Sequence, residues 1–413
     1  MPTDQSNRLS VLMLDLASIV PYYTGHLTTA LVKEGGVELE VGSINYHLDP
    51  GYFERQGVSR CSNVLDVVSK LSIRSAKLRQ GLKAVEYMFN LFAVLGRCLL
   101  TRPDVVHIQF LPLFATRLPF ERWFLQALHL AGLNIVYTVH NMLPHDTGKR
   151  HHQRYENLYR MMDGLICHDE AACVRLTQEF QVDPRKVKII PHGPLFDQTQ
   201  GREAAIARKA LGLPEDGLIV LCQGILRPYK GVDVLLDAWR AVHAANAAAT
   251  LVIVGAGTED LQNQIQDSVH EFEISSSVRL DLRFVSASEL ADYYSAADIL
   301  VYPYREITSS GSLMTGINRG KGIVASRLAA FEEILSDGEN ALLVAPGDAL
   351  QLATALQLLI GDAKLRSRLA SYETPAGPQW PTIAQETIRA YADAAVRPQK
   401  ATNGQKALTN RSS

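Results

Sequence analysis

Short apolar segments alternate with longer segments of helical periodicity over most of the chain. Each apolar segment is brief, rich in β-branched residues, and bounded by polar residues, Gly or Pro. Continuous apolarity, instead of strict alternation, predicts strands that are buried on both faces of a parallel sheet. In the N-terminal half, the predicted strands are LSVLMLDLA (9–17), ELEVGSI (38–44), DVVHIQF (104–110), NIVYTVH (134–140), GLICH (164–168) and VKIIPHG (187–193).

The same pattern returns in the C-terminal half, after a polar linker with Gly and Pro that begins near Gly193. Segments 233–247 and 350–361 there carry apolar residues at helical spacing. Two successive series of strand–helix units predict an α/β chain of two Rossmann-like, doubly wound domains that face each other across a ligand cleft. The predicted strands of the second series are GLIVLCQG (217–224), TLVIVGAG (250–257), LDLRFVS (280–286), DILVYPY (298–304), GIVASR (322–327) and NALLVAPG (340–347).

Composition narrows the class of protein. The chain has 413 residues, enough for two domains, and 47% hydrophobic with 20% charged residues is an ordinary globular balance. A net charge of −2 gives no overall field that attracts nucleic acid, so we expect no nucleic-acid partner. We find no secretory signal pattern and no uninterrupted apolar run of about 18 residues, which favours a cytoplasmic protein. Scattered cysteines without CxxC spacing predict free thiols at Cys61, Cys98, Cys167, Cys173 and Cys222.

The strongest local signal for chemistry is the sequence GILRPYKG at 224–231, directly after a predicted strand. Gly224 allows a ligand to approach the backbone, and Arg227 and Lys230 follow in one short loop before a predicted helix. A guanidinium and an ammonium beside a helix N-terminus suit a diphosphate. Two solvated surface cations in a turn are the alternative, and the order of strand, Gly and helix favours the diphosphate site.

A second segment, YREITSSGS at 304–312, follows the predicted strand 298–304. Its small hydroxyl residues and Gly would present hydroxyl and backbone N–H donors at a strand-to-helix turn, which suits an anion. An ordinary Ser/Thr helix cap is the alternative. Gly255, in the turn that ends another strand, belongs either to a nucleotide site or only to a tight turn. The candidate anion-binding residues of this segment are Thr308, Ser309, Ser310, Gly311 and Ser312.

In the N-terminal half, candidate ligand-binding residues follow two predicted strands. His140 ends the strand 134–140 and would face the cleft, and a hydrogen-bonded structural histidine is the alternative. The segment 22–26 follows the first strand and precedes a predicted helix. Gly25 there would let a ligand approach, and a plain loop-to-helix turn is the alternative. The candidates for contact with an acceptor saccharide are Tyr22, Tyr23, His26 and Asn141.

Residues 68–102 join a basic part to an apolar one, YMFNLFAVLGRCLL. A basic amphipathic segment that runs into an apolar one can lie on an anionic membrane surface. A core-facing helix with one solvated face is the alternative. The basic residues of the segment are Lys70, Arg74, Lys77, Arg79 and Lys83.

These elements, in this order, resemble the family 4 glycosyltransferases of the GT-B fold, from the first strand to about Tyr391. The sharpest part is IVLCQGILRPYKGVDVLLDAW (219–239), which is similar to the donor-phosphate segment of that family. GKGIVAS (320–326) resembles a segment usually written G-x-P-V-[IV]-A-S. QWPTIAQETIRAYA (379–392) resembles the closing helix that crosses back to the N-terminal domain.

The resemblance implies a division of the chain into functional units. Residues 1–195 would form an acceptor domain and 196–378 a nucleotide-sugar donor domain. Residues 379–396 would form the crossover helix, and composition predicts a disordered tail at 397–413. The donor would be a UDP- or GDP-sugar, and the acceptor a saccharide or a polyprenyl-linked saccharide. The segment 68–102 would then place the protein on the inner face of the plasma membrane.

The resemblance also implies roles for the candidate residues. Arg227 and Lys230 would neutralise the donor pyrophosphate, helped by donors from 308–312. Backbone near Phe284 and Val285 would meet the base, and His140 would lie by the transferred sugar. Gly25, Gly224 and Gly255 would let the donor approach the chain closely.

One segment departs from the family pattern. Most members carry two glutamates in the loop before the G-x-P-V segment. Here the second position is Thr315, and only Glu306 can serve as the first, after a shift of one residue. The second glutamate commonly holds the donor ribose, so ribose recognition must differ. A Ser-Gly-rich loop is closer to a branch that includes mannosyltransferases of lipid-linked saccharides.

The sequence therefore predicts a retaining hexosyltransferase of exopolysaccharide or glycoconjugate biosynthesis, without a cofactor. Its expected catalytic residues are His140, Arg227, Lys230 and Glu306. We expect a metal-independent reaction, since no acidic DxD cluster stands at a strand end of the C-terminal half. A non-catalytic nucleotide-sugar-binding partner of a glycosyltransferase is the alternative, because of the missing glutamate, and a sugar-nucleotide epimerase is a third reading. A dehydrogenase is disfavoured, because no GxGxxG follows a strand with an acidic residue at the expected distance.

Overall fold

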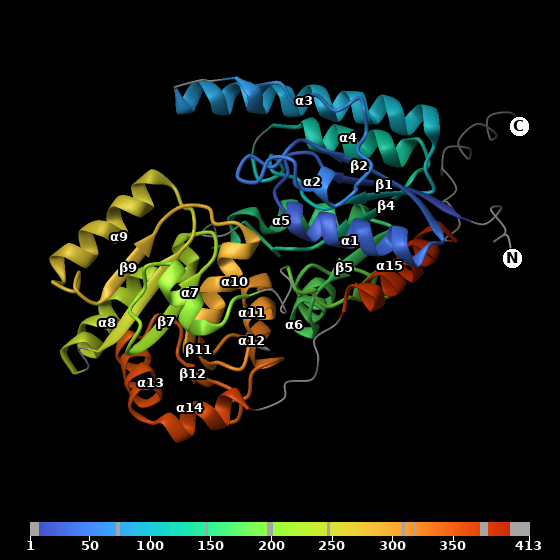
Figure 1. Cartoon of the computed structure of the whole chain (residues 1–413). Helices are drawn as coiled ribbons and strands as arrows, with labels where there is room; N and C mark the ends of the chain where they lie inside the picture. The colour runs from blue at the N-terminus through green and yellow to red at the C-terminus, as the bar shows by residue number, and fades with distance from the viewer. Residues whose placement is uncertain are drawn as a thin grey trace, which may run out of the picture.

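Two six-stranded parallel sheets, one from each half of the chain, form the frame of the molecule (Figure 1). Their strand orders, β2-β1-β3-β4-β5-β6 and β12-β11-β10-β7-β8-β9, are those of two doubly wound α/β units. The predicted two-domain α/β fold is confirmed. The structure is a computed structural model that describes residues 8–71, 75–116, 118–144, 148–195, 201–245, 248–307, 310–317, 319–371 and 379–396.

The strands are short, and those inside the sheets are almost wholly buried, as their continuous apolarity predicts, whereas the edge strands β6 and β9 are more exposed. All four residues of β3 and all six of β8 are buried. The first sheet contains β1 (Leu9–Asp15), β2 (Val37–Ser43), β3 (Val105–Ile108), β4 (Asn134–Thr138), β5 (Gly164–Cys167) and β6 (Val187–Ile189). The second contains β7 (Leu218–Gln223), β8 (Ala249–Val254), β9 (Val278–Asp281), β10 (Ile299–Tyr302), β11 (Gly322–Ser326) and β12 (Leu342–Val344).

Each predicted strand occurs, but most end earlier than their apolar segment. β4 ends at Thr138 and β6 at Ile189, whereas the segments run to 140 and 193. β9 is displaced, since it begins before the predicted 280–286 and ends within it. Val139 and Ile190 still donate a backbone hydrogen bond to the neighbouring strand, and the residues after them lie in loops at the carboxyl edge of the sheet. These loops line the cleft described below.

Helices cover both faces of each sheet (Figure 1). Helix α1 includes the segment 22–26 that was expected to precede it, since it begins at Pro21, and proline at the first helical position needs no N–H partner. The N-terminal helices are α1 (Pro21–Glu34), α2 (Tyr52–Arg55), α3 (Ala76–Thr101), α4 (Phe120–Leu130), α5 (His152–Met161) and α6 (Glu170–Val174). The others are α7 (Ala204–Ala210), α8 (Val232–Ala245), α9 (Glu259–Glu271), α10 (Ala287–Ala296), α11 (Gly311–Gly316), α12 (Ala329–Glu332), α13 (Ala349–Gly361), α14 (Ala363–Ala370) and α15 (Trp380–Ala395).

The last helix, α15, returns to the N-terminal half and packs on α1, β3, β4 and β5 (Figure 1). Its Ile383 and Tyr391 are buried in one cluster with Leu27 and Val136 of the N-terminal half. The indole N–H of Trp380 donates a hydrogen bond of 2.8 Å to the Pro194 carbonyl. The boundaries of the functional units stay predictions, and the tail 397–413 lies outside the described residues.

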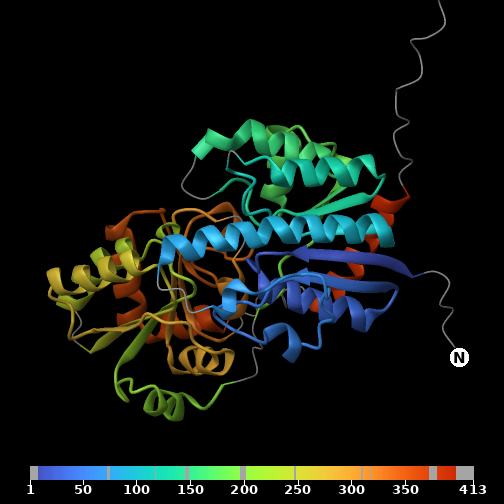
Figure 2. The same ribbon diagram turned by 90° about the horizontal axis from the view of Figure 1, so that it is seen from above.

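Helix α3 lies along the outer surface of the N-terminal half, against α4 (Figures 1 and 2). Its inner face is tied to the protein, since the Glu86 carboxylate accepts a hydrogen bond of 3.0 Å from the Val68 N–H. Among the described helices, only the stretch Lys77–Thr101 is long and apolar enough to cross a membrane, and a third of its most apolar window is buried. The predicted free thiols are confirmed at Cys61, Cys98, Cys167, Cys173 and Cys222.

Candidate functional site

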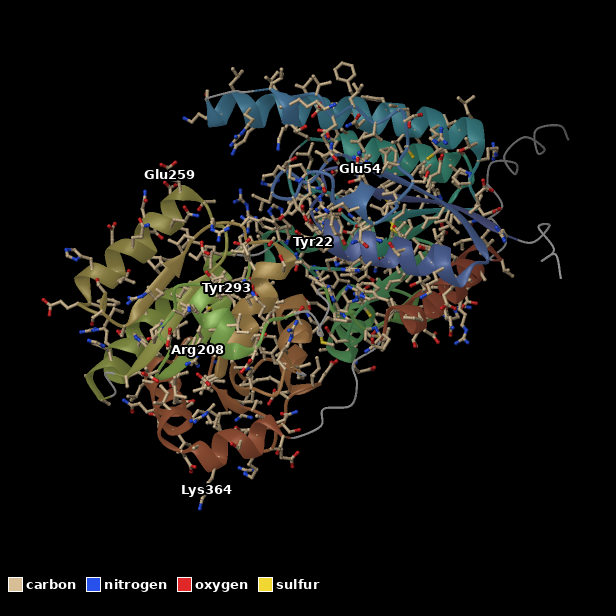
Figure 3. All side chains as sticks on the ribbon, viewed as in Figure 1. Tyr22, Glu54, Arg208, Glu259, Tyr293 and Lys364 are labelled. Atoms are coloured by element: carbon tan, nitrogen blue, oxygen red, sulfur yellow. The ribbon has the colours of Figure 1, made fainter. Side chains whose placement is uncertain are left out.

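A cleft lies between the carboxyl ends of the two sheets, as expected for two doubly wound units. In Figure 3, Tyr22 lies near the boundary between the two halves. The N-terminal half lines the cleft with Ile19, Val20, Pro21, Tyr22, Tyr23, Tyr46, His140, His192 and Leu195. The C-terminal half contributes Gln223, Gly224, Ile225, Val254, Gly255, Ala256, Phe284, Val285, Leu290 and Ser312. Every group of lining residues follows a strand, so the topology builds the cleft.

Asp15, the last residue of β1, positions the start of α1 at the cleft. Its buried carboxylate accepts hydrogen bonds from the backbone N–H groups of Ile19 (2.8 Å) and Val20 (3.1 Å). Burial raises the pKa of Asp15 to about 6, while these bonds favour the ionised form. The turn they hold brings Tyr22 and Tyr23 to the N-terminal wall.

The Lys230 ammonium lies behind the C-terminal wall, beside the lining residues Gly224 and Ser312. Lys230 is only 6% exposed, and its Nζ lies 2.9 Å from the Tyr304 hydroxyl and 3.4 Å from that of Ser312. Burial disfavours the charged form, but the oxygens of Tyr304 and Tyr229 outweigh it, and the pKa of Lys230 lies above its ordinary value. No carboxylate pairs with Lys230 within the described ranges. A buried cation without an anion is unfavourable, so this pocket is suited to an anionic ligand.

Gly224 and Gly255 bring two loops together beside this ammonium. Their φ angles, +123° and +144°, are rarely adopted by residues with a side chain. A Cβ at Gly224 would lie 2.4 Å from the Lys230 Nζ, and one at Gly255 would lie 2.0 Å from the Gly224 carbonyl oxygen. Gly224 has no room for a side chain while Lys230 keeps its place, and Gly255 has none while the Gly224 backbone keeps its place.

The start of α11 closes the site between the two halves. The Ser310 hydroxyl accepts a hydrogen bond of 3.2 Å from a backbone N–H of the first helical turn, which is the ordinary cap that the sequence left open. A Cβ at Gly311 would lie 2.4 Å from Leu195 of the N-terminal half, and Ser312 contacts Lys230. The two remaining candidates of this segment, Thr308 and Ser309, lie outside the described residues.

Three other positions of the donor segments lie away from the cleft surface. Thr315 is fully buried, and its hydroxyl donates to the Gly311 carbonyl at 2.7 Å, so it does not replace a ribose-binding glutamate. Glu306 is exposed. Arg227 is also exposed and lines a neighbouring groove. Burial raises the pKa of Tyr46 to about 12 and the Arg227 charge acts against it, so the guanidinium lies near this residue of the facing half.

His140 is buried in a group of polar side chains at the end of β4. Its Nε2 lies 3.0 Å from the Gln109 Oε1, and its Nδ1 lies 3.4 Å from the His168 Nε2. Burial, followed by the nearby charges of His168 and His192, lowers the pKa of His140 well below its ordinary value. The ring is therefore neutral at physiological pH.

His168 and His192 were not selected in the sequence, although they follow β5 and β6 as His140 follows β4. The three rings surround Tyr23, at centroid distances of 4.8 Å for His140, 5.3 Å for His168 and 5.1 Å for His192. Burial lowers the pKa of His168 to about 4 and that of His192 to about 3. The segments GLICH and IIPHG carry the same signal as YTVH, which is a histidine just after a buried strand. Among the described residues, no group of three or more His, Cys, Asp or Glu side chains is arranged to hold a metal ion.

Three predicted site residues have structural neighbours instead of a place on the cleft surface. A Cβ at Gly25 would lie 2.6 Å from the Tyr52 ring, so this glycine makes room for Tyr52 and not for a ligand. The His26 Nε2 lies 2.7 Å from the Leu195 carbonyl oxygen. Asn141 offers its backbone carbonyl to a tyrosine hydroxyl. None of the three is among the described residues that line the cleft.

Phe284 and Val285, expected beside the base, lie in the C-terminal wall. The Phe284 ring is parallel to that of Tyr22 across the cleft, with centroids 6.5 Å apart, and meets the Tyr46 ring edge-on at 6.1 Å. The two halves thus approach each other through aromatic side chains at this end of the cleft.

Family models match both halves of the chain. The model described as Glycosyltransferase Family 4 matches residues 21–194, and the model described as Glycosyl transferases group 1 matches residues 217–362. Together the two matches cover most of the chain and most of the residues that line the cleft.

Individual proteins resemble the chain over most of its length. A D-inositol 3-phosphate glycosyltransferase of Stackebrandtia nassauensis is 28% identical over 307 residues, 71% of this chain and 69% of the relative. A GDP-mannose:glycolipid 4-beta-D-mannosyltransferase of Xanthomonas campestris pv. campestris is 28% identical over 325 residues, 73% of this chain and 83% of the relative.

Solved structures share the fold. Sucrose-phosphate synthase from Thermosynechococcus elongatus has a TM-score of 0.73 at 18% identity, covering 93% of this chain and 98% of its own. The Anabaena protein HepE, in complex with UDP and glucose, has a TM-score of 0.66 at 16% identity, covering 94% and 97%. At these sequence identities, the structural similarity shows that the fold is shared.

Proposed function

Since the chain belongs to the family 4 glycosyltransferases of the GT-B fold, we propose that it transfers a hexosyl unit from a nucleoside-diphosphate sugar to a saccharide or lipid-linked saccharide, with retention of configuration. The donor would bind the unit 196–378 and the acceptor the unit 1–195. The observation that carries this proposal is the buried Lys230 ammonium beside the cleft, which no carboxylate pairs within the described residues. A donor diphosphate supplies the anion that this pocket lacks.

The proposed reaction breaks the bond between the anomeric carbon and an oxygen of the β-phosphate. The sugar becomes cation-like, and negative charge grows on the leaving diphosphate. Lys230 would stabilise this charge without reorganisation, because Tyr304 and Ser312 already hold its ammonium in place. Arg227 would add a second cation from the rim, and Gly224 would let the phosphates approach the backbone.

The other candidates would complete the site around this diphosphate. Donors from 308–312 would contact its oxygens, and backbone at 284–285 would meet the base. His140 would lie by the sugar and Glu306 at the rim, while Tyr22 and Tyr23 would belong to the acceptor side. We expect no metal requirement, so transfer should persist in excess chelator, and loss of activity that added Mg²⁺ or Mn²⁺ restores would contradict this expectation.

The names of similar proteins give the donors to test first. The Xanthomonas relative is named for GDP-mannose and a glycolipid acceptor, and HepE was solved with UDP-glucose. Purified protein should be incubated with GDP-mannose and with UDP-glucose, with and without a lipid extract as acceptor. Product analysis by NMR should show one donor consumed, a new glycoside and an unchanged anomeric configuration. Donor binding without turnover over the whole panel would favour the non-catalytic partner.

We also propose that α3 attaches the protein to the cytoplasmic face of the membrane. The outward side of this helix bears six apolar side chains that are each at least 43% exposed. Lys77, Arg79 and Lys83 on the first half of the helix would face anionic headgroups. The apolar residues are Leu78, Val85, Phe89, Phe92, Leu99 and Leu100.

Vesicle flotation tests this attachment. The protein should float with phosphatidylcholine vesicles that contain phosphatidylglycerol and remain at the bottom with phosphatidylcholine alone. The pair Phe89→Ser and Phe92→Ser should abolish flotation. Leu350→Ser, which removes a side chain 76% exposed on α13, serves as the control and should float normally. Equal flotation of both variants would remove α3 from the proposal.

A further inference from the structure

Two loops carry the proposed diphosphate site, and the sheet aligns them only over a short distance. The loop 227–231 follows β7, and a second segment, which includes the start of α11, follows the neighbouring strand β10. The last registered pair between these strands is Leu300 with Leu221, two residues before the end of each strand. Contacts beyond the ladder must therefore set the distance between the two loops.

Lys230 depends on that distance. Its backbone belongs to the loop after β7, whereas its ammonium lies 2.9 Å from the Tyr304 hydroxyl and 3.4 Å from the Ser312 hydroxyl, both after β10. A shift of one loop against the other would separate the ammonium from the start of α11. A displacement of about 1 Å in a reacting site can cost up to about 100-fold in rate.

Arg305, in the segment after β10, contacts both ends of the loop 227–231. Its backbone N–H donates to the Tyr229 carbonyl at 2.7 Å, and its guanidinium donates to the Pro228 carbonyl at 3.2 Å. Both terminal nitrogens also donate to the Asp233 carboxylate, each at 2.6 Å. Asp233 lies in the first turn of α8, directly after the loop. One residue after β10 therefore joins the two loops through its backbone and its side chain.

The loop backbone packs closely on the same segment. Gly231 has a φ of +67°, and a Cβ there would lie 2.0 Å from the Pro303 carbonyl oxygen. Burial would raise the pKa of Asp233, but the Arg305 guanidinium and the N–H groups at the start of α8 outweigh it, and the pKa lies below its ordinary value. The pair of Asp233 and Arg305 is thus charged at physiological pH.

This pair lies outside the cleft. Arg305 and Asp233 line the neighbouring groove, and neither is among the described residues that line the cleft. The Arg305 side chain is 42% exposed and that of Asp233 67%. An ion pair so exposed contributes little to the free energy of unfolding. A guanidinium that donates to both carboxylate oxygens does fix a geometry, however, which an ammonium cannot reproduce.

We propose that Arg305, paired with Asp233, is a positioning residue that fixes the loop 227–231 against the start of α11, so that Lys230 and α11 contact the same diphosphate. Arg305 itself does not touch the substrate. The inference rests on the proposed function, since it concerns the same donor site.

A coupling experiment tests whether Arg305 acts through Lys230. Arg305→Met keeps an unbranched side chain without the guanidinium, and calorimetry should show about tenfold weaker binding of UDP or GDP, whichever binds the wild type. In the Lys230→Met background, the same substitution should cost less than about threefold, because the group that it positions is already absent. Arg305→Lys keeps the charge but not the planar fork, so it should regain only part of the affinity.

Asp233→Asn separates positioning from a direct contact of Arg305 with the diphosphate. Removing a negative charge near an anion site favours anion binding, and it would also release a guanidinium to contact the ligand. Direct contact therefore predicts equal or tighter binding by Asp233→Asn. Positioning predicts weaker binding, by about threefold, and no further loss when Asp233→Asn is added to Arg305→Met.

Arg327→Met is the matched control. Arg327 is 44% exposed, pairs with Glu332 and Asp337, and donates to the Leu343 carbonyl in the same half of the chain. It is not among the described residues that line the cleft. This variant should bind the diphosphate as the wild type does, and urea unfolding should show similar stability for Arg327→Met and Arg305→Met.

Four results would overturn the assignment. They are unchanged diphosphate affinity in Arg305→Met, the full tenfold loss in the Lys230→Met background, equal or tighter binding by Asp233→Asn, and a much lower stability of Arg305→Met than of Arg327→Met. In each case the wild type still binds a nucleoside diphosphate and turns over its sugar conjugate. A wild type that binds no nucleoside diphosphate and turns over no nucleotide sugar would instead defeat the proposed function.

Discussion

The two walls of the cleft bury titratable side chains in opposite charge states. On the N-terminal wall, burial lowers the pKa values of His140, His168 and His192, and the rings stay neutral. On the C-terminal wall, Lys230 is as deeply buried but keeps a raised pKa, because tyrosine oxygens surround its ammonium. The buried ammonium thus lies on the side that would meet a diphosphate, and neutral imidazoles lie on the opposite wall.

The largest effect is expected from removing the charge of the C-terminal wall. Lys230→Met should lower kcat/KM about 100- to 1,000-fold, by analogy with the loss of one donor to a developing anion. Steady-state kinetics should include Lys321→Met, which removes a half-buried lysine that donates to the Ser295 carbonyl. A similar loss in both variants would mean that the difference in charge between the two walls does not contribute to catalysis.

A smaller effect should follow from displacing the ammonium without removing it. Gly224→Ala places a methyl group where Lys230 and Ser312 now lie, so kcat/KM should fall about 10- to 100-fold, less than the loss of the whole donor. Gly347→Ala introduces similar positive-φ strain in open space and should lower only stability, by about 1 kcal/mol. Equal kinetics of the two variants would contradict the crowded geometry.

The neutral wall should be visible in the pH dependence of stability. The folded pKa of His168, about 4, lies below the value of about 6.5 in the unfolded chain, so the unfolded state binds more protons between them. Its contribution is fully present above pH 6.5 and is lost as the pH falls toward 4. From pH 7 to pH 5, urea unfolding should show that the wild type loses about 2 kcal/mol more than His168→Asn.

The comparison of the wild type with His168→Asn at both pH values removes the contributions of the other titratable groups to the free energy of unfolding. Buried Asp15 and Glu121 have raised pKa values, about 6 and about 7, and stabilise the fold in the opposite direction as the pH falls. Both residues are present in the wild type and in His168→Asn, so their effects cancel. Identical losses in the two proteins would mean that His168 is not held neutral.

The smallest effect on ligand binding is expected at Gly25. Gly25→Ala should push the Tyr52 ring and lower the free energy of unfolding by about 1–3 kcal/mol, as overpacking does. Affinity for the nucleoside diphosphate, measured by calorimetry, should differ by less than about twofold between Gly25→Ala and the wild type. A tenfold loss of affinity with unchanged stability would restore this glycine to the donor site.

The sequence was sufficient to predict the two sheets, because strands of a parallel sheet that are buried on both faces appear as short, continuous apolar segments. The apolar segments at 134–140 and 187–193 run past their strands, however, since apolarity reports burial and not ladder bonds. The residues beyond the ladders, such as His140 and His192, are those that reach the cleft. The residues that the sequence wrongly assigned to strand ends are therefore the residues that reach the cleft.

The roles of single side chains depended on contacts that no local pattern carries. Lys230 was recognisable because a loop after a glycine precedes a helix, but its burial against Tyr304 requires the folded sheet. Gly25 makes room for the ring of Tyr52, which is distant in the sequence. The local sequence could not show this contact, and the glycine was therefore assigned to a ligand site. Likewise, only the register of β4, β5 and β6 brings His168 beside His140.

Calorimetric titration of UDP and GDP into the wild type and Lys230→Met measures whether the buried ammonium contacts the donor diphosphate. One of the two diphosphates should bind the wild type, and Lys230→Met should bind it at least about tenfold more weakly, since a buried charge-assisted contact is lost. Equal affinity of both proteins would show that the buried ammonium does not meet the diphosphate, and the proposed donor site would be wrong.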